Sequence, residues 1–281
     1  MGDSHGRFVW YELMTTDMKA ARTFYAKVIG WGTENASMPG MPYSLFTVAG
    51  ASVSGLMGLP EDAKEMGVKP SWIGYVAVDD VDAAASRVAE LGGTVHVGPR
   101  EIGDISRFAV FVDPQMAGLA LLQWLKPRRE RPAEPSATGR VGWHELLAAD
   151  VEKAFGFYSD LLGWQKAQTN QGERGAYQRF SAGGQTIGGM YAKPPTAPSS
   201  FWLYYFNVAD IDAAAERVTV GGGQIIEGPL EVPEDSWIIH GIDPQGAMFA
   251  LEGKRGRKSI GYFERTAPDA AADARGRRWY W

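Results

Sequence analysis

The stretch VWYELMTTDMKAARTFYAKVIGW (Val9–Trp31) decides the fold of this chain, because it occurs a second time as GWHELLAADVEKAFGFYSDLLGW (Gly142–Trp164). The later segment VDDVDAAASRVAELGG (Val78–Gly93) also returns, as VADIDAAAERVTVGGG (Val208–Gly223), and a DPQ turn followed by an apolar stretch comes after each. Repeats of this length indicate two copies of one domain rather than a solenoid of small units. Every candidate functional residue can therefore be compared with its counterpart in the other copy.

The two copies align at a spacing of 133 residues through their first halves, and this alignment pairs Gly55 with Gly188. From Trp72 and its counterpart Trp202 onward the spacing is 130. The alignment predicts that the second copy lacks three residues between Met190 and Trp202. Both segments at this point are polar and rich in proline, which is typical of surface connections whose length changes at little cost.

Composition limits the classes of function. The chain has 281 residues, enough for two domains of about 125 residues each. A net charge of −5 argues against a general nucleic-acid binder, and the absence of cysteine excludes disulfides, thiol catalysis and thiolate metal sites. No apolar run approaches the roughly 18 residues of a membrane span, and the N-terminus lacks the apolar core of a signal peptide. We expect a soluble cytoplasmic protein with no membrane or nucleic-acid partner.

The predicted organisation has four parts. Residues 1–125 form the first domain, 126–140 a basic, proline-rich linker that we expect to be extended, and 141–253 the second domain. Residues 254–281 form a basic tail that ends in RGRRWYW. A contact of this tail with RNA or membrane is conceivable, but we favour a solvated arm whose aromatic residues pack on the protein or on a partner domain.

Within each copy the hydrophobic pattern predicts the order βαβββ twice. A strand at Phe8–Thr15 leads into an amphipathic helix of about Asp17–Ile29, whose apolar positions recur at three and four residues. Asp17 and its counterpart Asp150 precede the helices as N-caps. The predicted class is α+β, and two such modules side by side make a curved sheet whose concave face is a natural pocket.

These motifs resemble the vicinal oxygen chelate superfamily, which contains glyoxalase I, bleomycin and fosfomycin resistance proteins and extradiol dioxygenases. The resemblance rests on the strand followed by D…A..FY...LGW, on the second strand followed by DDVDAA…LGG, and on the turn DPQ.A..AL. It covers Phe8–Trp124 and Val141–Gly253, and the tandem form is similar to two-domain glyoxalase-like proteins of bacteria. It implies the fold but not the reaction, because one scaffold hosts many chemistries.

In the metal enzymes of this superfamily three strands each supply one ligand. The first two ligands precede the helix-capping Asp of each module by seven residues, and the third follows the Asp of the DP turn by seven. Metals of this class need a histidine nitrogen or a carboxylate oxygen. Neither copy supplies one, and we therefore expect no metal at the usual position. The residues found there are Trp10, Ile73 and Ala120 in the first copy and Trp143, Leu203 and Ala250 in the second.

Glu12 and Glu145 are the strongest polar candidates. Residues two apart on a strand share a face, so each Glu is expected to point the same way as the Trp two positions before it, into the pocket. Such a carboxylate is either a general base or an anchor for a ligand's amine or hydroxyl, or it makes a structural hydrogen bond. The residues expected to bind the ligand are Trp10, Trp143, Tyr75, Tyr205, Ile73, Leu203 and Glu252, and the aromatic ones suit a planar or hydrophobic molecule.

Two histidines of the second copy have no histidine counterpart. The alternation predicts that His144 points away from Glu145, to the sheet surface or the seam between domains, and His240 is expected to be partly buried and hydrogen-bonded. A relocated metal site built from Glu145, Glu252 and one of these histidines is an alternative.

Three functions follow as hypotheses. The first is a glyoxalase-like or resistance-type protein that binds an aromatic or carbonyl-containing small molecule without a metal or other cofactor. The second is a metal-independent lyase or isomerase that uses Glu12 or Glu145 as general base, and the third is a divalent-metal glyoxalase or dioxygenase with relocated ligands in the second domain. Because two domains of this superfamily typically face each other, the tandem chain is expected to be a monomer or a weak homodimer.

Overall fold

The structure is a computed structural model that describes residues 4–37, 40–65, 67–126, 136–172 and 175–256. Most of the predicted linker and nearly all of the predicted tail lie outside the described residues. The first domain contains β1 (Phe8–Thr15), α1 (Met18–Val28), β2 (Gly32–Asn35), β3 (Tyr43–Val48), β4 (Ala51–Gly58), α2 (Glu61–Glu65), β5 (Ser71–Ala77), α3 (Val81–Glu90), β6 (Thr94–Ile102), β7 (Ser106–Val112) and β8 (Gly118–Trp124).

The second domain repeats this order, except that the described chain has no counterpart of the short α2. Its elements are β9 (Val141–Ala148), α4 (Val151–Leu162), β10 (Gln165–Gly172), β11 (Gly175–Ala182), β12 (Gln185–Ala192), β13 (Phe201–Val208), α5 (Ile211–Val220), β14 (Gln224–Val232), β15 (Ser236–Ile242) and β16 (Met248–Gly253). The predicted α+β class and the βαβββ modules are confirmed.

Among the described residues the strands form two sheets of identical topology. Their orders are β2-β3-β4-β1-β5-β8-β7-β6 and β10-β11-β12-β9-β13-β16-β15-β14. The first strands of the two modules are antiparallel neighbours in the middle of each sheet, β1 beside β5 and β9 beside β13. The candidate residues on these strands are therefore brought together at the centre of the sheet.

The helices begin where the sequence predicts. The carboxylates of Asp17 and Asp150 each accept a hydrogen bond from a backbone N–H three residues further on, at 2.9 and 3.1 Å. These bonds satisfy N–H groups that have no partner within the helix. Gly163 ends α4 with a φ of 72°, a left-handed conformation that glycine adopts without steric cost.

The strand register corrects the predicted alignment of the two copies. Glu12 pairs with Gly55 and Glu145 pairs with Gly189, so the counterpart of Gly55 is Gly189, and the spacing here is 134. Gly188 pairs instead with His144. The second copy therefore has one extra residue within β10, where the register with β11 shifts between Lys166 and Thr169, and four fewer residues, not three, before Trp202. A bulge of one residue in a largely polar edge strand leaves no mark on the hydrophobic pattern, so the pattern did not reveal it.

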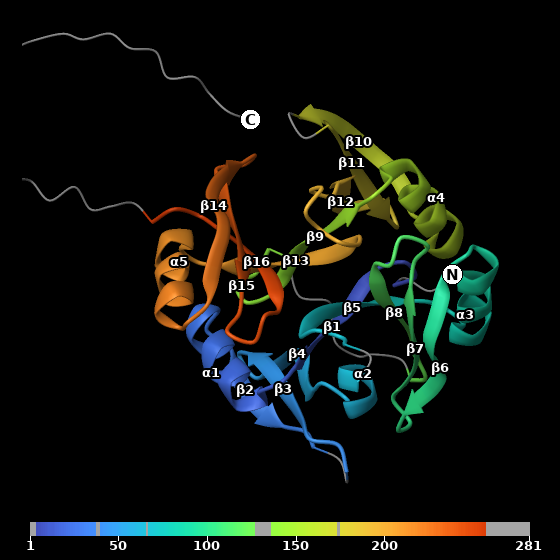
Figure 1. The fold of residues 1–281 in the computed structure, drawn as a ribbon, viewed down its shortest axis with the longest axis horizontal. Coiled ribbons are helices and arrows are strands. Elements are labelled where there is room, and N and C mark those ends of the chain that lie inside the picture. The colour runs from blue at the N-terminus through green and yellow to red at the C-terminus, as the bar shows by residue number, and fades with distance from the viewer. Residues whose placement is uncertain (1–3, 38–39, 66, 127–135, 173–174, 257–281) are drawn as a thin grey trace, which may run out of the picture.

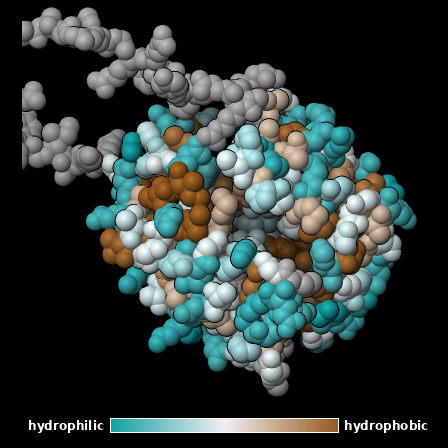
Figure 2. All heavy atoms as spheres, viewed as in Figure 1, coloured by the Kyte–Doolittle hydropathy of each residue, from teal (hydrophilic) through white to brown (hydrophobic). Residues whose placement is uncertain are grey.

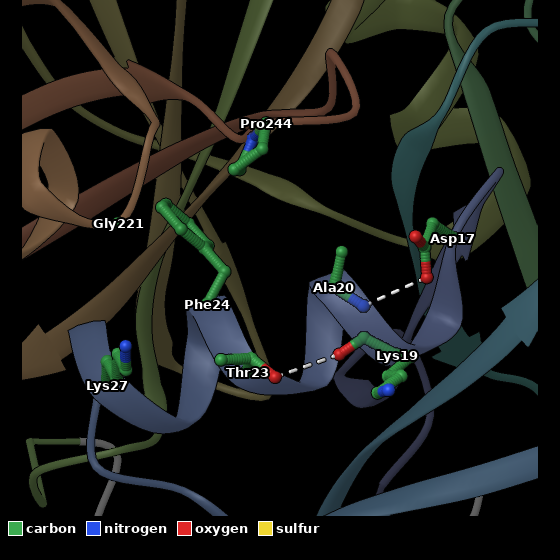
Figure 3. Close-up of a pocket in the computed structure, with 8 residues that line it drawn as sticks. All are labelled: Asp17, Lys19, Ala20, Thr23, Phe24, Lys27, Gly221 and Pro244. Carbon is green, nitrogen blue, oxygen red and sulfur yellow. Dashed lines mark hydrogen bonds between the residues drawn. The ribbon is translucent and has the colours of Figure 1, made fainter.

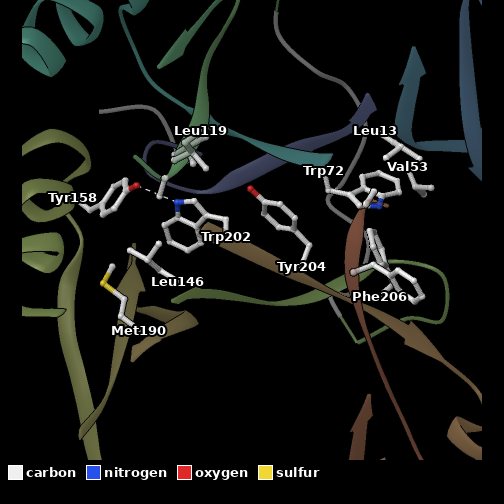
Figure 4. Packing of buried hydrophobic residues seen from close by; sticks show 14 of the residues in the cluster. Leu13, Val53, Trp72, Leu119, Leu146, Tyr158, Met190, Trp202, Tyr204 and Phe206 are labelled. Atoms are coloured by element: carbon white, nitrogen blue, oxygen red, sulfur yellow. Dashed lines mark hydrogen bonds between the residues drawn. The ribbon is translucent and has the colours of Figure 1, made fainter. Parts of the chain in front are cut away.

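The two sheets stand back to back, and each curves away from the other (Figure 1). Helix α1 packs against α5 on one side, and α3 packs against α4 on the other. One large core fills the space between the sheets and includes residues of both domains, such as Leu13, Trp72, Trp202 and Phe206 (Figure 4). The two repeats therefore form a pseudo-symmetric pair with a shared core.

The repeated FY and DPQ motifs join the domains across this core. The Tyr25 hydroxyl donates to Asp243 at 3.1 Å and accepts from the Trp72 indole at 2.9 Å. In the equivalent contact of the other repeat, the Tyr158 hydroxyl donates to Asp113 at 3.0 Å. Burial raises the pKa of both aspartates, and the hydrogen bonds oppose that rise. Residues that the sequence marks as repeated core thus also bind one domain to the other.

His144 lies at the seam between the domains and not beside Glu145. Its ring stacks on Phe8 with centroids 3.8 Å apart, and its Nε2 lies 2.6 Å from the Tyr11 hydroxyl. Its Nδ1 donates to the carbonyl of Ile187 at 2.6 Å. Burial lowers the pKa of His144 to about 4. This histidine is therefore a neutral structural residue, as the strand alternation indicated.

Candidate functional site

The outward face of each sheet carries an apolar cluster separate from the shared core. In the first domain Ile73, Tyr75, Ala120 and Leu122 are buried there, with partly exposed side chains packed around them. In the second domain the corresponding cluster contains Leu203, Tyr205 and Ala250. These two concave faces lie on opposite sides of the molecule (Figure 1).

The strand alternation places the predicted residues on these faces. Trp10 and Trp143 are partly exposed at the rim of each cluster, while Ile73, Leu203, Tyr75 and Tyr205 are buried. In the register Ile73 lies beside Glu12, and Leu203 lies beside Glu145. Glu252 is partly buried on β16, two residues beyond Ala250, with Ile238 and Asn207 as register partners.

In the first domain Glu12 is held by two tyrosines. The hydroxyls of Tyr43 and Tyr75 donate to its two carboxylate oxygens at 2.7 and 3.1 Å. Trp10 in turn makes a hydrogen bond to Tyr43. Glu12 is only 9% exposed, and burial raises its pKa while the two tyrosine hydrogen bonds lower it. A carboxylate in this setting is able to exchange a proton at a pH closer to neutrality than a solvated one.

The second domain repeats the arrangement around Glu145. The Tyr177 and Tyr205 hydroxyls donate to its two oxygens at 2.9 and 2.5 Å, and the Trp143 indole donates to Tyr177 at 2.8 Å. Each concave face therefore carries the same cluster of Trp, Tyr, Glu and Tyr. In both copies the tyrosine pKa values are raised, first by burial and then by the neighbouring carboxylate. The hydroxyls consequently remain protonated donors.

Tyr43 and Tyr177 were not predicted, although a glycine marks the place of each. A Cβ on Gly55 would stand 1.9 Å from the Tyr43 hydroxyl, and a Cβ on Gly189 would stand 2.2 Å from the Tyr177 ring. Only glycine at these positions lets the tyrosine lie across the strand and reach the carboxylate. The repeated glycine in β4 and β12 was the signal that could have located them.

His240 and Glu227 extend the second cluster only. The Nε2 atom of His240 lies 2.8 Å from the Tyr205 hydroxyl, and its Nδ1 lies 3.2 Å from Glu227 Oε2. The sequence predicts a partly buried, hydrogen-bonded His240, and the structure agrees. The structure also settles its face, since His240 is the register partner of Ala250.

The residues at the family's metal positions do not fit a metal ion. Trp10, Ile73 and Ala120 offer neither imidazole nor carboxylate, and their counterparts in the second domain offer none either. Across the described chain no group of three His, Cys, Asp or Glu side chains is placed to hold a metal. Ala250 instead lies between Tyr205 and His240 in the sheet, and its short side chain leaves room for their contact.

A surface groove lies elsewhere, between α1 and the DP turn of the second domain (Figure 3). It has a volume of about 350 Å³ and is lined by Lys19, Thr23, Phe24, Lys27 and Pro244, among others. Its polar groups are exposed or satisfied within α1, as in the hydrogen bond from the Thr23 hydroxyl to the Lys19 carbonyl. The concave faces, where buried polar groups converge, are the better candidates.

Comparison with known families agrees with this architecture. The family model described as "Glyoxalase/Bleomycin resistance protein/Dioxygenase superfamily" matches residues 7–121 and again residues 140–251. The chain belongs to this superfamily. Both matches fall on the predicted domains, so the resemblance drawn from the repeated motifs is confirmed.

Relatives of similar length share both domains. "Putative glyoxylase CFP32" of Mycobacterium bovis is 34% identical over 244 residues, which is 86% of this chain and 92% of that protein. "Anthracycline biosynthesis protein DauV" of Streptomyces sp. is 30% identical over 264 residues, covering 88% of this chain and 92% of the relative.

Solved structures support the fold alone. The Mn(II)-bound glyoxalase of Novosphingobium aromaticivorans has a TM-score of 0.61 at 17% identity, with 90% of this chain and 83% of that chain covered. The 2,3-dioxygenase LapB of Pseudomonas has a TM-score of 0.60 at 11% identity, with 92% of this chain and 95% of that chain covered.

The helices in the described part of the chain were also compared with the length and hydropathy that a membrane span requires. None of them meets both requirements.

Proposed function

We propose that this protein binds a small molecule with a flat aromatic ring and hydroxyl or carbonyl groups on its concave faces, without a metal ion at the family's usual position. The observation that carries the proposal is the buried cluster of Trp, Tyr, Glu and Tyr, which both domains contain on the concave side of the sheet. Buried polar groups are costly unless they are satisfied, and the duplicated cluster supplies donors and acceptors at one point of an apolar surface.

Each part of the cluster suits one part of such a ligand. The indoles of Trp10 and Trp143 are partly exposed and offer flat surfaces for a ring. The carboxylates and the tyrosine oxygens accept from a phenol or alcohol, and a tyrosine hydroxyl that leaves its carboxylate donates to a carbonyl. The name of one relative refers to anthracycline biosynthesis, and anthracyclines are flat polycyclic hydroxyquinones, which favours this chemical class.

Figure 2 shows one face of the molecule, on which hydrophobic residues are exposed in patches among hydrophilic ones. Large apolar patches open to solvent are unusual on monomeric proteins and are typical of binding surfaces.

We also propose that the chain is a monomer, because the seam between its own domains takes the place of a dimer interface.

Titration with 1,4-dihydroxyanthraquinone, followed by quenching of tryptophan fluorescence, tests the proposal. We expect saturable quenching and a raised melting temperature, since a ligand that binds the folded state stabilises it. The variant Tyr43→Phe/Tyr177→Phe should weaken binding, whereas the exposed Glu231→Gln should not. An unchanged melting temperature and no quenching would refute binding of this ligand class.

A second candidate function is catalysis with Glu12 or Glu145 as general base of a lyase or isomerase. It is favoured by the raised pKa of Glu12, because an effective base has a pKa near the working pH. The third, a metal enzyme with relocated ligands, requires Glu145, Glu252 and a histidine to converge. His144 contacts Tyr11 at the domain seam and does not point towards Glu145, so the remaining histidine for such a site is His240. Metal analysis of protein purified without chelator tests this alternative.

A further inference from the structure

The two concave faces differ in charge at one position beside the glutamate cluster. In the second domain Arg179 of β11 pairs with Gly189 of β12, which pairs in turn with Glu145 of β9. In the first domain the corresponding position beside Gly55 holds Leu45. Residues paired across neighbouring strands share a face of the sheet, so Arg179 adds a cation to the second concave face where the first face is apolar.

The charge of Arg179 is kept apart from that of Glu145. Tyr177 lies across Gly189, the residue between them, since a Cβ on this glycine would stand 2.2 Å from the Tyr177 ring. The two oxygens of Glu145 already accept from Tyr177 and Tyr205. No carboxylate of the residues that the structure describes forms an ion pair with Arg179. The second face therefore carries a guanidinium without a counter-ion from the described chain.

The hydrogen-bond donors of this guanidinium are also incompletely used. Its Nε is buried and has no hydrogen-bond partner in the described part of the chain. The Cζ atom lies 5.9 Å from the centre of the Trp143 ring, near the limit of a cation–π contact, whereas Arg255 lies 3.9 Å from the ring of Trp237. A buried donor without an acceptor is costly, so this position favours a ligand that supplies one.

The charges of the second face are separated along the sheet. Arg179 lies on β11 near one edge, and Glu227 and Glu252 lie on β14 and β16, with β12, β9 and β13 in between (Figure 1). The counterparts of these two glutamates in the first domain are the apolar Val97 and Leu122. A ligand with one acidic end is therefore expected to bind the second face in one direction, with its acid at β11.

We propose that the second concave face binds an aromatic carboxylate whose acid group is held by Arg179, while the first face binds uncharged aromatic molecules. This inference rests on the proposed binding function. The guanidinium is planar, and Nε and one Nη can donate in parallel to the two oxygens of a carboxylate. Arg179 supplies one positive charge, which a carboxylate balances and a doubly charged phosphate exceeds. The ring then lies towards the apolar cluster that contains Leu203 and Tyr205.

The test compares 1,4-dihydroxyanthraquinone-2-carboxylate with its methyl ester, which has the same rings and no charge. Isothermal titration calorimetry at about pH 8, where the carboxylic acid is ionised, gives the Kd and the number of sites for each. We expect the wild type to bind one carboxylate about tenfold to a hundredfold more tightly than the ester, as hydrogen bonds to charged groups contribute effects of this size. The preference should shrink at about 0.5 M salt, which screens the ion pair.

Two exchanges between the domains supply matched variants. Arg179→Leu gives the second domain the residue that the first domain already accommodates at Leu45, and we expect the ratio of the two Kd values to fall to about one. The reciprocal Leu45→Arg should add a second tight site for the carboxylate. The exposed control Glu231→Gln should keep the wild-type ratio and the wild-type number of sites.

The outcomes separate the two proposals. Equal Kd values for acid and ester in the wild type, or a preference that survives Arg179→Leu, would overturn the carboxylate site and leave the binding function standing. Equal weakening of both ligands in Arg179→Leu, with a lowered melting temperature, would make Arg179 a structural residue and overturn the site as well. If Arg179→Leu does not fold, the absence of an added site in Leu45→Arg would overturn it. Absence of binding by acid, ester and 1,4-dihydroxyanthraquinone alike would overturn the proposed function itself, and the inference with it.

Discussion

Acid should weaken this protein through His144. The residue is buried at the domain seam, where its neutral form satisfies both neighbours: Nδ1 donates to the Ile187 carbonyl and Nε2 accepts from the Tyr11 hydroxyl. Burial depresses the pKa from 6.5 to about 4. The unfolded chain therefore binds a proton over this range and the folded chain does not, so stability falls as the pH drops from 6.5 towards 4.

The size of the effect follows from the shift. One pKa unit is worth about 1.4 kcal/mol, so complete titration corresponds to about 3 kcal/mol of unfolding free energy. Between pH 8 and pH 5 the expected loss is about 2 kcal/mol, since His144 in the folded state is still mostly neutral at pH 5. This is a large fraction of the free energy that stabilises a typical domain.

Urea unfolding at pH 8, 7, 6 and 5, followed by tryptophan fluorescence, measures it. The matched variant is His144→Gln, which can still donate to Ile187 and accept from Tyr11 but does not titrate. Buried carboxylates such as Glu12 have raised pKa values and act in the opposite sense, but they are common to both proteins and cancel in the comparison. Parallel stability curves for wild type and variant, or a His144 pKa near 6.5 by NMR, would refute the reasoning.

Three further predictions address the site, the seam and a helix end. Gly189→Ala should displace the Tyr177 ring, because the added Cβ would stand 2.2 Å from it. We expect this variant to bind 1,4-dihydroxyanthraquinone more weakly and to have a lower melting temperature than the wild type. Tyr25→Phe should cost about 1–3 kcal/mol in urea unfolding, since it leaves the buried Asp243 without that donor; a loss within error would contradict the role given to the seam. Asp150→Ala should cost about 1 kcal/mol by removing the N-cap of α4, measured in the same assay, and an unchanged midpoint would contradict the capping contact.

The sequence was sufficient for the fold and for the faces of the central strands. Glu12 follows Trp10 by two residues on a strand, and the pleat alone puts both on one face. The repeat identified helices, caps and modules because each signal occurred once in each copy and in the same order. The domain boundaries at 125 and 141 stay predictions, since residues 127–135 lie outside the described part of the chain.

The partners of the two glutamates could not be predicted in this way. Tyr43 and Tyr177 come from strands that are not adjacent to Glu12 or Glu145 in sequence, and their placement depends on a strand register that a one-residue bulge alters. The link from Tyr205 to His240 depends on the order of strands in the sheet, which joins β13 to β15 through β16. Local periodicity carries information on which face a residue occupies, but it carries none on which strands meet.

The central claim is that side chains of the Glu and Tyr clusters, rather than a metal ion, hold a ligand on the concave faces. Its most direct test is the affinity for 1,4-dihydroxyanthraquinone before and after exhaustive EDTA treatment, in the wild type and in the Glu12→Gln/Glu145→Gln variant. The account predicts that chelation leaves the Kd within about twofold and that the double substitution weakens binding about tenfold or more, as expected for loss of hydrogen bonds to a charged group. Binding that disappears with EDTA and returns on addition of Mn²⁺ or Zn²⁺, with the double variant unaffected, would contradict it.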